Sequence, residues 1–328
     1  MGNSQSELQA FVPRRHLSGG HVQTIASFFL ARRIALPPFE ERLIEVEPGV
    51  KVLCHCHWQP NREEALTVLL LHGLEGSSDS QYMKGIAAKG MALGMNVVRM
   101  NQRNCGGTDG FSPTLYHSGR SADIAAVVRH LIDQDRISHF ALAGFSMGGN
   151  LVLKLAGEWG REAPAQFRGV AAVCPAMNLA ASADALHLRE NLLYELYFVW
   201  KLRRRLMEKA RLFPDKFDLG RLRGVKSLRD FDDRITAYYS GFADADDYYA
   251  RASAANVVDR IAVPCLILHA ANDPFIRILP ETRNKVLANP SITFIETQDG
   301  GHCSFLANPD GDDGHWAEQQ ILNFLRRF

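Results

Sequence analysis

The spacing of hydrophobic residues changes near residue 65 of this 328-residue chain. Before that point apolar and polar residues alternate over residues 43–46 and 50–57, which predicts strands buried on one face. After it, short runs are apolar throughout, as in strands of a parallel sheet that helices cover on both faces. These runs predict buried strands at residues 67–71, 96–100, 140–143, 169–174, 265–270 and 292–296.

Segments with apolar residues three and four positions apart lie between several of these runs, and this spacing is typical of amphipathic helices. They predict helices at residues 83–93, 120–133, 151–158 and 315–327, and a similar pattern predicts an earlier one at 17–33. Strands that alternate with helices form a doubly wound sheet whose functional loops lie at the carboxyl ends of the strands. We therefore expect an α/β fold with a mostly parallel sheet.

The alternation stops between residues 176 and 255, where no segment has a convincing strand pattern. Within it, residues 186–213 carry Leu, Tyr and Phe on one side and basic residues on the other. The basic residues include Lys201, Arg203, Arg204 and Arg205. We interpret the stretch as a helical cap whose basic side faces solvent; a basic amphipathic helix lying on a membrane is the alternative. The expected organisation is one domain over residues 1–328, with the cap at 176–255 inserted in it.

Composition and charge exclude several classes of protein. Hydrophobic residues make up 46% of the chain and charged residues 22%, so it can bury a core and does not resemble a disordered protein. The formal net charge is +1, so no overall field attracts nucleic acid. The six cysteines are scattered among apolar neighbours, which is not typical of a disulfide framework. A reducing compartment is therefore expected.

The beginning of the chain lacks the basic region, apolar stretch and cleavage site of a signal peptide. No other run is long and apolar enough for a membrane span. We expect a cytoplasmic protein without an integral membrane segment, and peripheral membrane contact through the cap stays open. The first six residues, 1–6, match the pattern for N-myristoylation, with a flexible polar leader as the alternative.

The sequence Gly144-Phe145-Ser146-Met147-Gly148 lies between a predicted strand and a predicted helix. A strand that turns sharply into a helix can hold a strained serine exposed at its tip, and the glycines avoid the clashes that larger residues would cause there. The five-residue pattern alone is common, but its position between strand and helix is specific. Ser146 is therefore the candidate nucleophile.

A serine nucleophile needs a base, and the base needs a carboxylate that orients it. In this arrangement the acid and the histidine follow the serine in sequence. Asp273 follows the buried run at 265–270, and His302 follows the run at 292–296, so both come at carboxyl ends of strands. Rival acids and bases fit worse because of their positions relative to the strands. These rivals are Asp259, Asp299, His269 and His315.

Acyl transfer also needs hydrogen-bond donors for the oxyanion of the tetrahedral intermediate. The backbone amide of Met147, directly after the nucleophile, is one candidate, because it lies at the amino end of a helix. The loop after the run at 67–71 supplies the second candidate, the amide of Leu74. Both donors are backbone groups, so their side chains are only indirect markers.

At this point the chain resembles the α/β-hydrolases, and more narrowly the YheT-like branch that also includes eukaryotic membrane-anchored abhydrolase lipases. The matching stretches are GHVQTI at 20–25, LHGLEGSSDS at 71–80, VRMNQRNCGG at 98–107, LYHSG at 115–119, GFSMGGN at 144–150, NDP at 272–274 and GGH at 300–302. The resemblance implies a carboxylic ester hydrolase and carries the catalytic triad onto Ser146, Asp273 and His302. The chain departs from the pattern at Gln102 and Asn104, and it has no N-terminal membrane helix of the kind the eukaryotic relatives carry.

The residue types of a metal site occur at Cys54, His55, Cys56 and His57, but strand alternation sends the cysteines to one face and the histidines to the other. We expect no metal and no cofactor. The hypothesis is a serine carboxylesterase for esters of short to medium acyl chains, acting through an acyl-enzyme. An acyltransferase, an acylglycerol lipase or phospholipase with the same triad, and a non-catalytic binding protein are the alternatives. The natural ester and the oligomeric state are not readable from the sequence.

Overall fold

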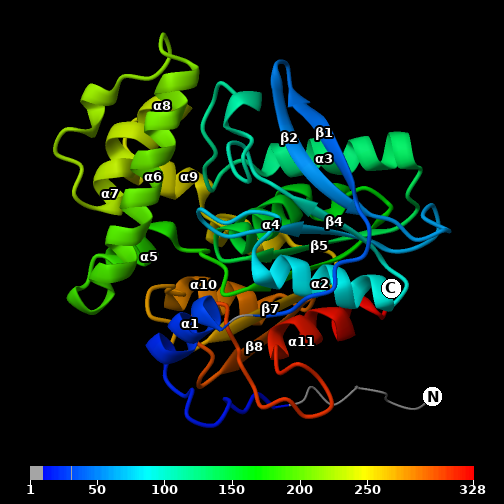
Figure 1. Cartoon of the computed structure of the whole chain (residues 1–328). Coiled ribbons are helices and arrows are strands. Elements are labelled where there is room, and N and C mark those ends of the chain that lie inside the picture. Colours follow the sequence, from blue (N-terminus) through cyan, green and yellow to red (C-terminus); the bar gives the residue numbers. More distant parts are fainter. Residues whose placement is uncertain (1–9, 31) are drawn as a thin grey trace.

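A single eight-stranded sheet forms the centre of the molecule in the computed structural model, which describes residues 10–30 and 32–328 (Figure 1). The strand order is β1-β2-β4-β3-β5-β6-β7-β8; the first two strands run antiparallel to their neighbours, and all later pairs are parallel. The strands are β1 (Glu40–Glu47), β2 (Val50–His57), β3 (Thr67–Leu71), β4 (Asn96–Met100), β5 (Phe140–Phe145), β6 (Phe167–Val173), β7 (Cys265–Ala270) and β8 (Ile292–Thr297). The N-myristoylation pattern at residues 1–6 lies outside the described residues.

Helices cover both faces of the sheet. They are α1 (Gly20–Phe29), α2 (Gln81–Ala92), α3 (Ser121–Asp135), α4 (Met147–Trp159), α5 (Leu179–Leu186), α6 (Leu192–Leu212), α7 (Leu228–Phe231), α8 (Tyr238–Ser240), α9 (Ala245–Ala252), α10 (Pro280–Ala288) and α11 (Trp316–Leu325). No helix in the described part of the chain is long and apolar enough to cross a bilayer. The sequence pattern missed α10, because this helix buries only Thr282 and Val286 and so lacks a clear apolar face.

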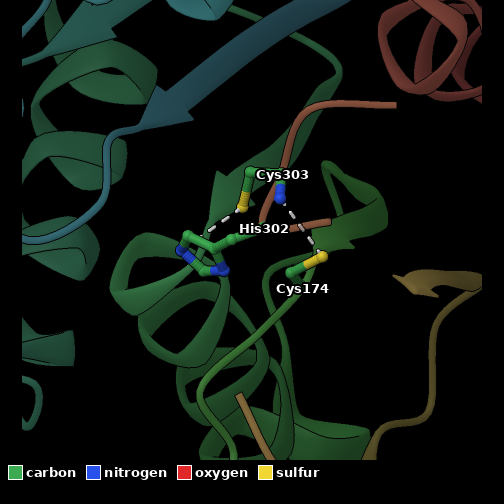
Figure 2. Close-up of side chains that lie close together, drawn as sticks. All are labelled: Cys174, His302 and Cys303. Carbon is green, nitrogen blue, oxygen red and sulfur yellow. Dashed lines mark hydrogen bonds between the residues drawn. The ribbon is translucent and has the colours of Figure 1, made fainter. Parts of the chain in front are cut away.

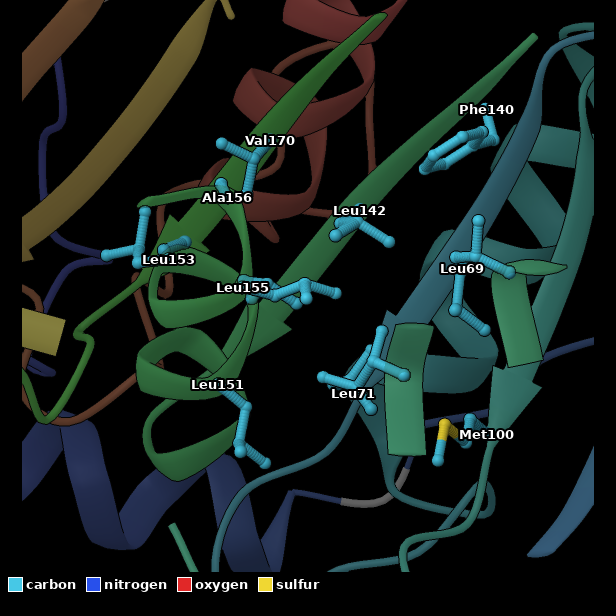
Figure 3. Close-up of a cluster of buried hydrophobic side chains, with 14 of the residues drawn as sticks. Leu69, Leu71, Met100, Phe140, Leu142, Leu151, Leu153, Leu155, Ala156 and Val170 are labelled. Carbon is cyan, nitrogen blue, oxygen red and sulfur yellow. The ribbon is translucent and has the colours of Figure 1, made fainter. Parts of the chain in front are cut away.

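The central strands are apolar throughout because each face packs on its own layer of helices. Along β3, Leu69 and Leu71 point into the core shared with α3 and α4, whereas Val68 and Leu70 point into the core shared with α2 and α11. Figure 3 shows the first core, in which leucines of α4 pack against β3 and β5. The two cores fix the sheet between rigid layers, so its carboxyl edge can hold side chains in fixed positions.

The chain between β6 and β7 contains only helices and turns in its described residues. Helices α5 to α9 of this inserted segment lie beside the sheet, at the upper left of Figure 1. The expectation that the basic side of the long helix faces solvent is wrong in part. Lys209 on α6 is fully buried, while Leu193 and Trp200 on the same helix are 79% and 52% exposed. Several cations of this helix therefore bind the rest of the protein, whereas Arg204 and Arg211 are exposed, and much of its apolar side faces outward.

Candidate active site

Ser146 lies at the turn between β5 and α4, and its backbone is strained. Its φ and ψ angles are 55° and −118°, a region that residues with a side chain rarely occupy. The amide of Ser146 donates to the carbonyl of Val173 over 2.9 Å, and its carbonyl accepts from the amide of Asn150 over 3.0 Å. These bonds to β6 and to the first turn of α4 hold the serine at the carboxyl edge of the sheet.

Two glycines of the predicted motif make this turn possible. A Cβ atom on Gly144 would lie 2.3 Å from the carbonyl oxygen of Gly148, and one on Gly148 would lie 2.5 Å from the carbonyl oxygens of Leu71 and His72. Such distances are far below van der Waals contact, and the obstacles are backbone atoms that cannot rotate away. The glycines are therefore a steric requirement for bringing α4 against the end of β3.

His302 and Asp273 come together from neighbouring strand ends, as their positions predict. Nδ1 of His302 lies 2.8 Å from Oδ2 of Asp273, while Oδ1 of Asp273 accepts from the amides of Phe275 and Ile276 over 3.1 and 2.9 Å. The carboxylate of Asp273 is buried, and these hydrogen bonds hold it in one orientation. This arrangement fixes the tautomer of His302, with its Nε2 turned away from Asp273 and able to accept a proton.

Their opposite charges shift the pKa values of Asp273 and His302 in the directions that favour an ion pair between them. Burial alone would raise the pKa of Asp273, but the charge of His302 and the hydrogen bond between them lower it overall. Burial alone would lower the pKa of His302, but the neighbouring Cys303 sulfur and the Asp273 carboxylate raise it well above its usual value. The environment therefore stabilises an imidazolium, which is the form that exists after His302 takes a proton from a nucleophile.

The loop that carries His302 is held by α1, a contact that the sequence reasoning did not foresee. The amide of His302 donates to Oγ1 of Thr24 over 2.8 Å. Buried Gln23 spans the base of the loop, with its Nε2 donating to the carbonyls of Leu17 and Leu306. At Gly301, which has φ of 58°, a Cβ would lie 2.5 Å from the carbonyl oxygen of Gly20. The GHVQTI stretch therefore positions the histidine, and its only sequence signal was its share in the family resemblance.

The loop after β3 brings the amide of Leu74 near Ser146. A Cβ on Gly73 would lie 3.2 Å from the Cβ of Ser146, so the two segments are in contact. The amides on either side of Leu74 donate to tyrosine hydroxyls, Gly73 to Tyr82 and Glu75 to Tyr116, over 3.0 and 3.2 Å. The structure gives the Leu74 amide no acceptor among the described residues, and amides in the first turn of a helix, such as that of Met147, have no acceptor within the helix.

His72 and Gln102 connect this loop to the end of β4. The buried, neutral imidazole of His72 bonds to the carbonyl of Gly73 over 2.8 Å and accepts from the amide of Gln102 over 3.1 Å. Burial is the main cause that lowers the pKa of His72 to about 4. The side chain of Gln102 donates back to the carbonyl of His72 over 2.7 Å. Gln102, where the chain departs from the family pattern, thus braces the loop that carries Leu74.

A cavity of about 110 Å³ opens beside Ser146, between the sheet edge and the inserted helices. Its lining from the sheet side includes Leu74, Met147 and Phe275, and the last of these packs against the ring of His302 at 4.4 Å. The inserted helices contribute mainly apolar side chains. These include Leu186, Phe198, Leu202, Leu206, Leu228 and Phe231. The cavity can therefore receive an apolar group attached to a carbonyl at Ser146.

The rival residues have other positions. Asp299 accepts from the amides of Gly19 and Gly300 and from the side chain of Asn272, so its carboxylate holds loops together. His269 is buried within β7, Asp259 precedes that strand in a short helical turn, and His315 precedes α11. The two faces of β2 separate Cys54 and Cys56, which enter the apolar core, from His55 and His57, whose rings lie near Phe39.

A different cluster has the residue types of a metal site. One ligand atom each of Cys174, His302 and Cys303 lies within 4.8 Å of the others. This cluster was not predicted, because residues 174 and 303 meet only when β6 and the loop after β8 come together.

Comparisons with known proteins also indicate an α/β-hydrolase. The family model described as "alpha/beta hydrolase fold" matches residues 67–309. The chain is 30% identical over 335 residues to "Putative esterase YheT" of Escherichia coli strain K12, covering 99% of this chain and 96% of that protein. It is 29% identical to "Phospholipase ABHD3" of Mus musculus, covering 90% of this chain and 72% of the relative.

Two further comparisons extend the range of relatives. "Medium-chain fatty acid ethyl ester synthase/esterase 2" of Saccharomyces cerevisiae is 26% identical and covers 80% of this chain and 62% of its own length. Among solved structures, the esterase Pf2001 of Pyrococcus furiosus aligns with a TM-score of 0.59 at 17% identity, covering 91% of this chain and 99% of that one. At that identity the structural likeness shows the fold alone.

Proposed function

The chain belongs to the α/β-hydrolase fold family, in its YheT-like branch, and is a carboxylic ester hydrolase; from this we propose that it is a serine carboxylesterase for short to medium acyl chains, with Ser146, Asp273 and His302 as its catalytic triad. The observation that carries the proposal is the bond between His302 and Asp273, at 2.8 Å, at the same sheet edge as the strained Ser146. An oriented base at the same sheet edge as a strained, partly exposed serine fits the arrangement that nucleophilic acyl transfer requires.

In the proposed mechanism, Oγ of Ser146 attacks the ester carbonyl while Nε2 of His302 takes its proton. The imidazolium so formed is stabilised by Asp273 and returns the proton to the leaving alcohol. The backbone amides of Leu74 and Met147 donate to the oxyanion, and removing one such donor in a well-studied protease costs roughly 3 to 4 kcal/mol. Water, activated by His302, then resolves the acyl-enzyme.

The inserted helices act as the cap that selects the acyl chain. The size of the cavity supports short to medium chains, because an engineered apolar cavity of about 150 Å³ holds one benzene ring. A cavity of about 110 Å³ therefore holds on the order of four carbon atoms without rearrangement. Longer acyl chains require the inserted helices to move or the chain end to leave the cavity.

Hydrolysis of p-nitrophenyl esters from two to sixteen carbons, by wild type and Ser146→Ala, tests this function. We expect activity to peak among the short to medium esters and to fall on the order of a millionfold in turnover in the variant. Ser146→Ala changes only a hydroxyl on a folded turn, so a melting temperature equal to that of wild type controls for folding. Equal activity of both proteins across the series would contradict the proposal.

Ester synthesis is the second candidate, because a relative at 26% identity carries the name of an ethyl ester synthase. The same acyl-enzyme would be resolved by an alcohol in place of water. Adding ethanol to the assay and separating the free acid from the ethyl ester decides between the two. A mainly ethyl ester product at low ethanol concentration would favour transfer; a mainly acid product favours hydrolysis.

We further propose peripheral contact with a lipid surface through an apolar face on α1 and α6. The face consists of exposed side chains of both helices: Ile25, Phe28, Phe29, Leu193, Leu196, Tyr197 and Trp200. The rings of Phe28 and Tyr197 lie 6.0 Å apart and join the two helices. A phospholipase among the relatives supports this contact.

The six unpaired cysteines support a reducing compartment, for which we propose the cytoplasm.

A further inference from the structure

Two thiols lie beside the imidazole of His302 (Figure 2). Cys303 follows His302 directly, and its Sγ lies 3.8 Å from Nε2 of that ring. Cys174 follows β6, and its Sγ accepts a hydrogen bond from the amide of Cys303 over 3.4 Å. Both sulfur atoms lie within 4.8 Å of each other. The pair is the only one among the described cysteines that reaches the proposed catalytic base.

The thiol of Cys303 is activated by this environment. Burial alone would raise its pKa, but the hydrogen bond with Cys174 and the charge of His302 lower the pKa overall. The thiolate is the reactive form of cysteine, and the contact of the Cys303 Sγ with Nε2 of His302 favours this form. Burial raises the pKa of Cys174 well above its usual value, so this thiol stays protonated and serves as a hydrogen-bond donor.

A small oxidant can reach Cys303 without entering the acyl cavity. Cys303 is partly exposed, whereas Cys174 is fully buried. Cys303 lines a second cavity of about 60 Å³, together with Ser27, Tyr82 and Phe145. A cavity can hold one water when the space open to a water-sized sphere is only about 10 to 15 Å³. Hydrogen peroxide therefore fits, whereas a bulky ester does not.

We propose that Cys303 and Cys174 form a hydroperoxide-sensitive modification site that inactivates the esterase reversibly by closing a disulfide. The Cys303 thiolate attacks one peroxide oxygen, the O–O bond breaks, and the departing oxygen takes up a proton and leaves as water or an alcohol. The resulting sulfenic acid is attacked by the sulfur of Cys174, whose proton leaves with the hydroxyl group as water. Two thiols are thereby oxidised by two electrons to one disulfide, and the peroxide is reduced by the same two.

Loss of activity follows from the movement that the bond requires, and this step rests on the proposed role of His302. A disulfide holds its sulfur atoms about 2 Å apart, so at least one side chain must shift. Cys174 can no longer accept the bond from the Cys303 amide in the same geometry, and the backbone of His302 adjoins that amide. The imidazole then leaves its alignment with Asp273 and Ser146, on which proton transfer depends.

The experiment treats purified full-length protein with a tenfold excess of hydrogen peroxide in the presence of a chelator, since thiolates and imidazole also bind Zn²⁺. Intact mass, peptide mapping and hydrolysis of a short p-nitrophenyl ester are measured before and after dithiothreitol. Wild type, Cys174→Ser and Cys303→Ser are compared with Cys265→Ser, which removes a buried thiol of β7 far from the pair in sequence. Each protein is compared with its own untreated activity.

We expect wild type and Cys265→Ser to lose two mass units at the 174–303 pair and at least about tenfold of their activity, with recovery after dithiothreitol. Cys303→Ser should resist the treatment. Cys174→Ser should lose activity irreversibly, because a sulfenic acid without a resolving thiol proceeds to sulfinic acid. Loss of activity in Cys303→Ser equal to that of wild type, or activity loss in wild type without a bond between residues 174 and 303, would overturn the proposal.

The same data separate this proposal from the proposed function. If the disulfide forms but no ester is hydrolysed by the untreated protein, the esterase assignment fails and the modification chemistry stands. If the untreated protein is active and peroxide leaves both thiols free, the modification site fails and the esterase assignment stands.

Discussion

Asp232 is a buried carboxyl that lines the proposed acyl cavity from the inserted helices. Burial is the main cause that raises its pKa to about 6, and the hydroxyls of Thr236 and Tyr249, which donate to it over 2.7 and 2.8 Å, offset only part of this effect. Its pKa is therefore higher in the folded than in the unfolded protein, where it is near 3.8. Between these two pH values the folded state binds more protons, so this group lowers stability as pH rises.

Asp232→Asn should remove that pH-dependent loss. Above pH 6 the native carboxylate is ionised in an apolar site at a cost on the order of 3 kcal/mol, whereas the amide is neutral at every pH. We expect the melting temperature of the variant, relative to wild type, to rise by roughly several degrees between pH 4 and pH 7.5. Burying the new amide hydrogens has a free-energy cost that does not depend on pH. This cost shifts the melting temperature of the variant by a similar amount at every pH.

The matched control for this prediction is Asp133→Asn, which replaces an exposed carboxyl near the end of α3. Its melting curve should run parallel to that of wild type over the same pH range. Parallel curves for Asp232→Asn as well would show that Asp232 does not titrate with a raised pKa.

At the residue scale, sequence reasoning located the groups that follow strands and missed those that depend on packing. Ser146, Asp273 and His302 were predictable because each comes at the carboxyl end of a buried strand, and parallel strands end at one edge. Thr24 and Cys174 were not, because their contacts with the His302 loop join segments that are more than 100 residues apart. The local spacing of hydrophobic residues carries no information about such long-range contacts.

At the scale of elements, α6 shows how an amphipathic pattern can be read the wrong way round. Its cations were expected to face solvent, yet Arg205 forms a bidentate pair with buried Glu75, over 2.7 and 2.9 Å. Lys201 donates to the carbonyl of Glu75, and Lys209 donates to the carbonyls of Asp109 and Ser112. Periodicity identifies the two sides of a helix, but it cannot say which side meets a polar loop.

The pair between Arg205 and Glu75 fastens α6 to the loop that carries Leu74. Arg205→Met should leave the Glu75 carboxylate buried without its charge partner, which typically costs about 3 to 5 kcal/mol. Because Glu75 adjoins Leu74, we expect kcat to fall more than the affinity for a short ester changes. Urea unfolding and the kinetics of p-nitrophenyl butyrate hydrolysis measure the two effects.

Two variants control for this effect. Arg204→Met removes an exposed cation from the same helix and should change stability by less than about 0.5 kcal/mol. The double variant Glu75→Gln, Arg205→Met removes both charges and should recover part of the lost stability, since no unpaired ion remains. Equal stability of Arg205→Met and Arg204→Met would contradict the importance of the pair.

At the scale of the whole molecule, a line of aromatic rings connects the apolar face of α1 and α6 with the proposed active site. His21 stacks on Tyr194 and bonds to its hydroxyl over 3.1 Å, and Tyr194 lies 5.3 Å from Phe275. Phe275 in turn packs against His302. The face combines apolar side chains with cations, because Arg204 lies over the ring of Trp200 at 4.9 Å.

This combination favours anionic bilayers, and flotation with vesicles tests it. We expect wild type to bind vesicles that contain phosphatidylglycerol more strongly than vesicles of phosphatidylcholine alone. Replacing Phe28 and Trp200 together by serine should weaken binding by at least about tenfold, because each buried aromatic side chain contributes roughly 1.5 to 3 kcal/mol.

Leu287→Ser, on α10, is the control, because it removes an equally exposed apolar residue outside the face. Since Phe28 and Trp200 do not line the acyl cavity, hydrolysis of a short soluble ester should be unchanged in the double variant. Vesicle binding that Leu287→Ser weakens as much as the double variant does would mean that general hydrophobicity, and not this face, contacts the lipid.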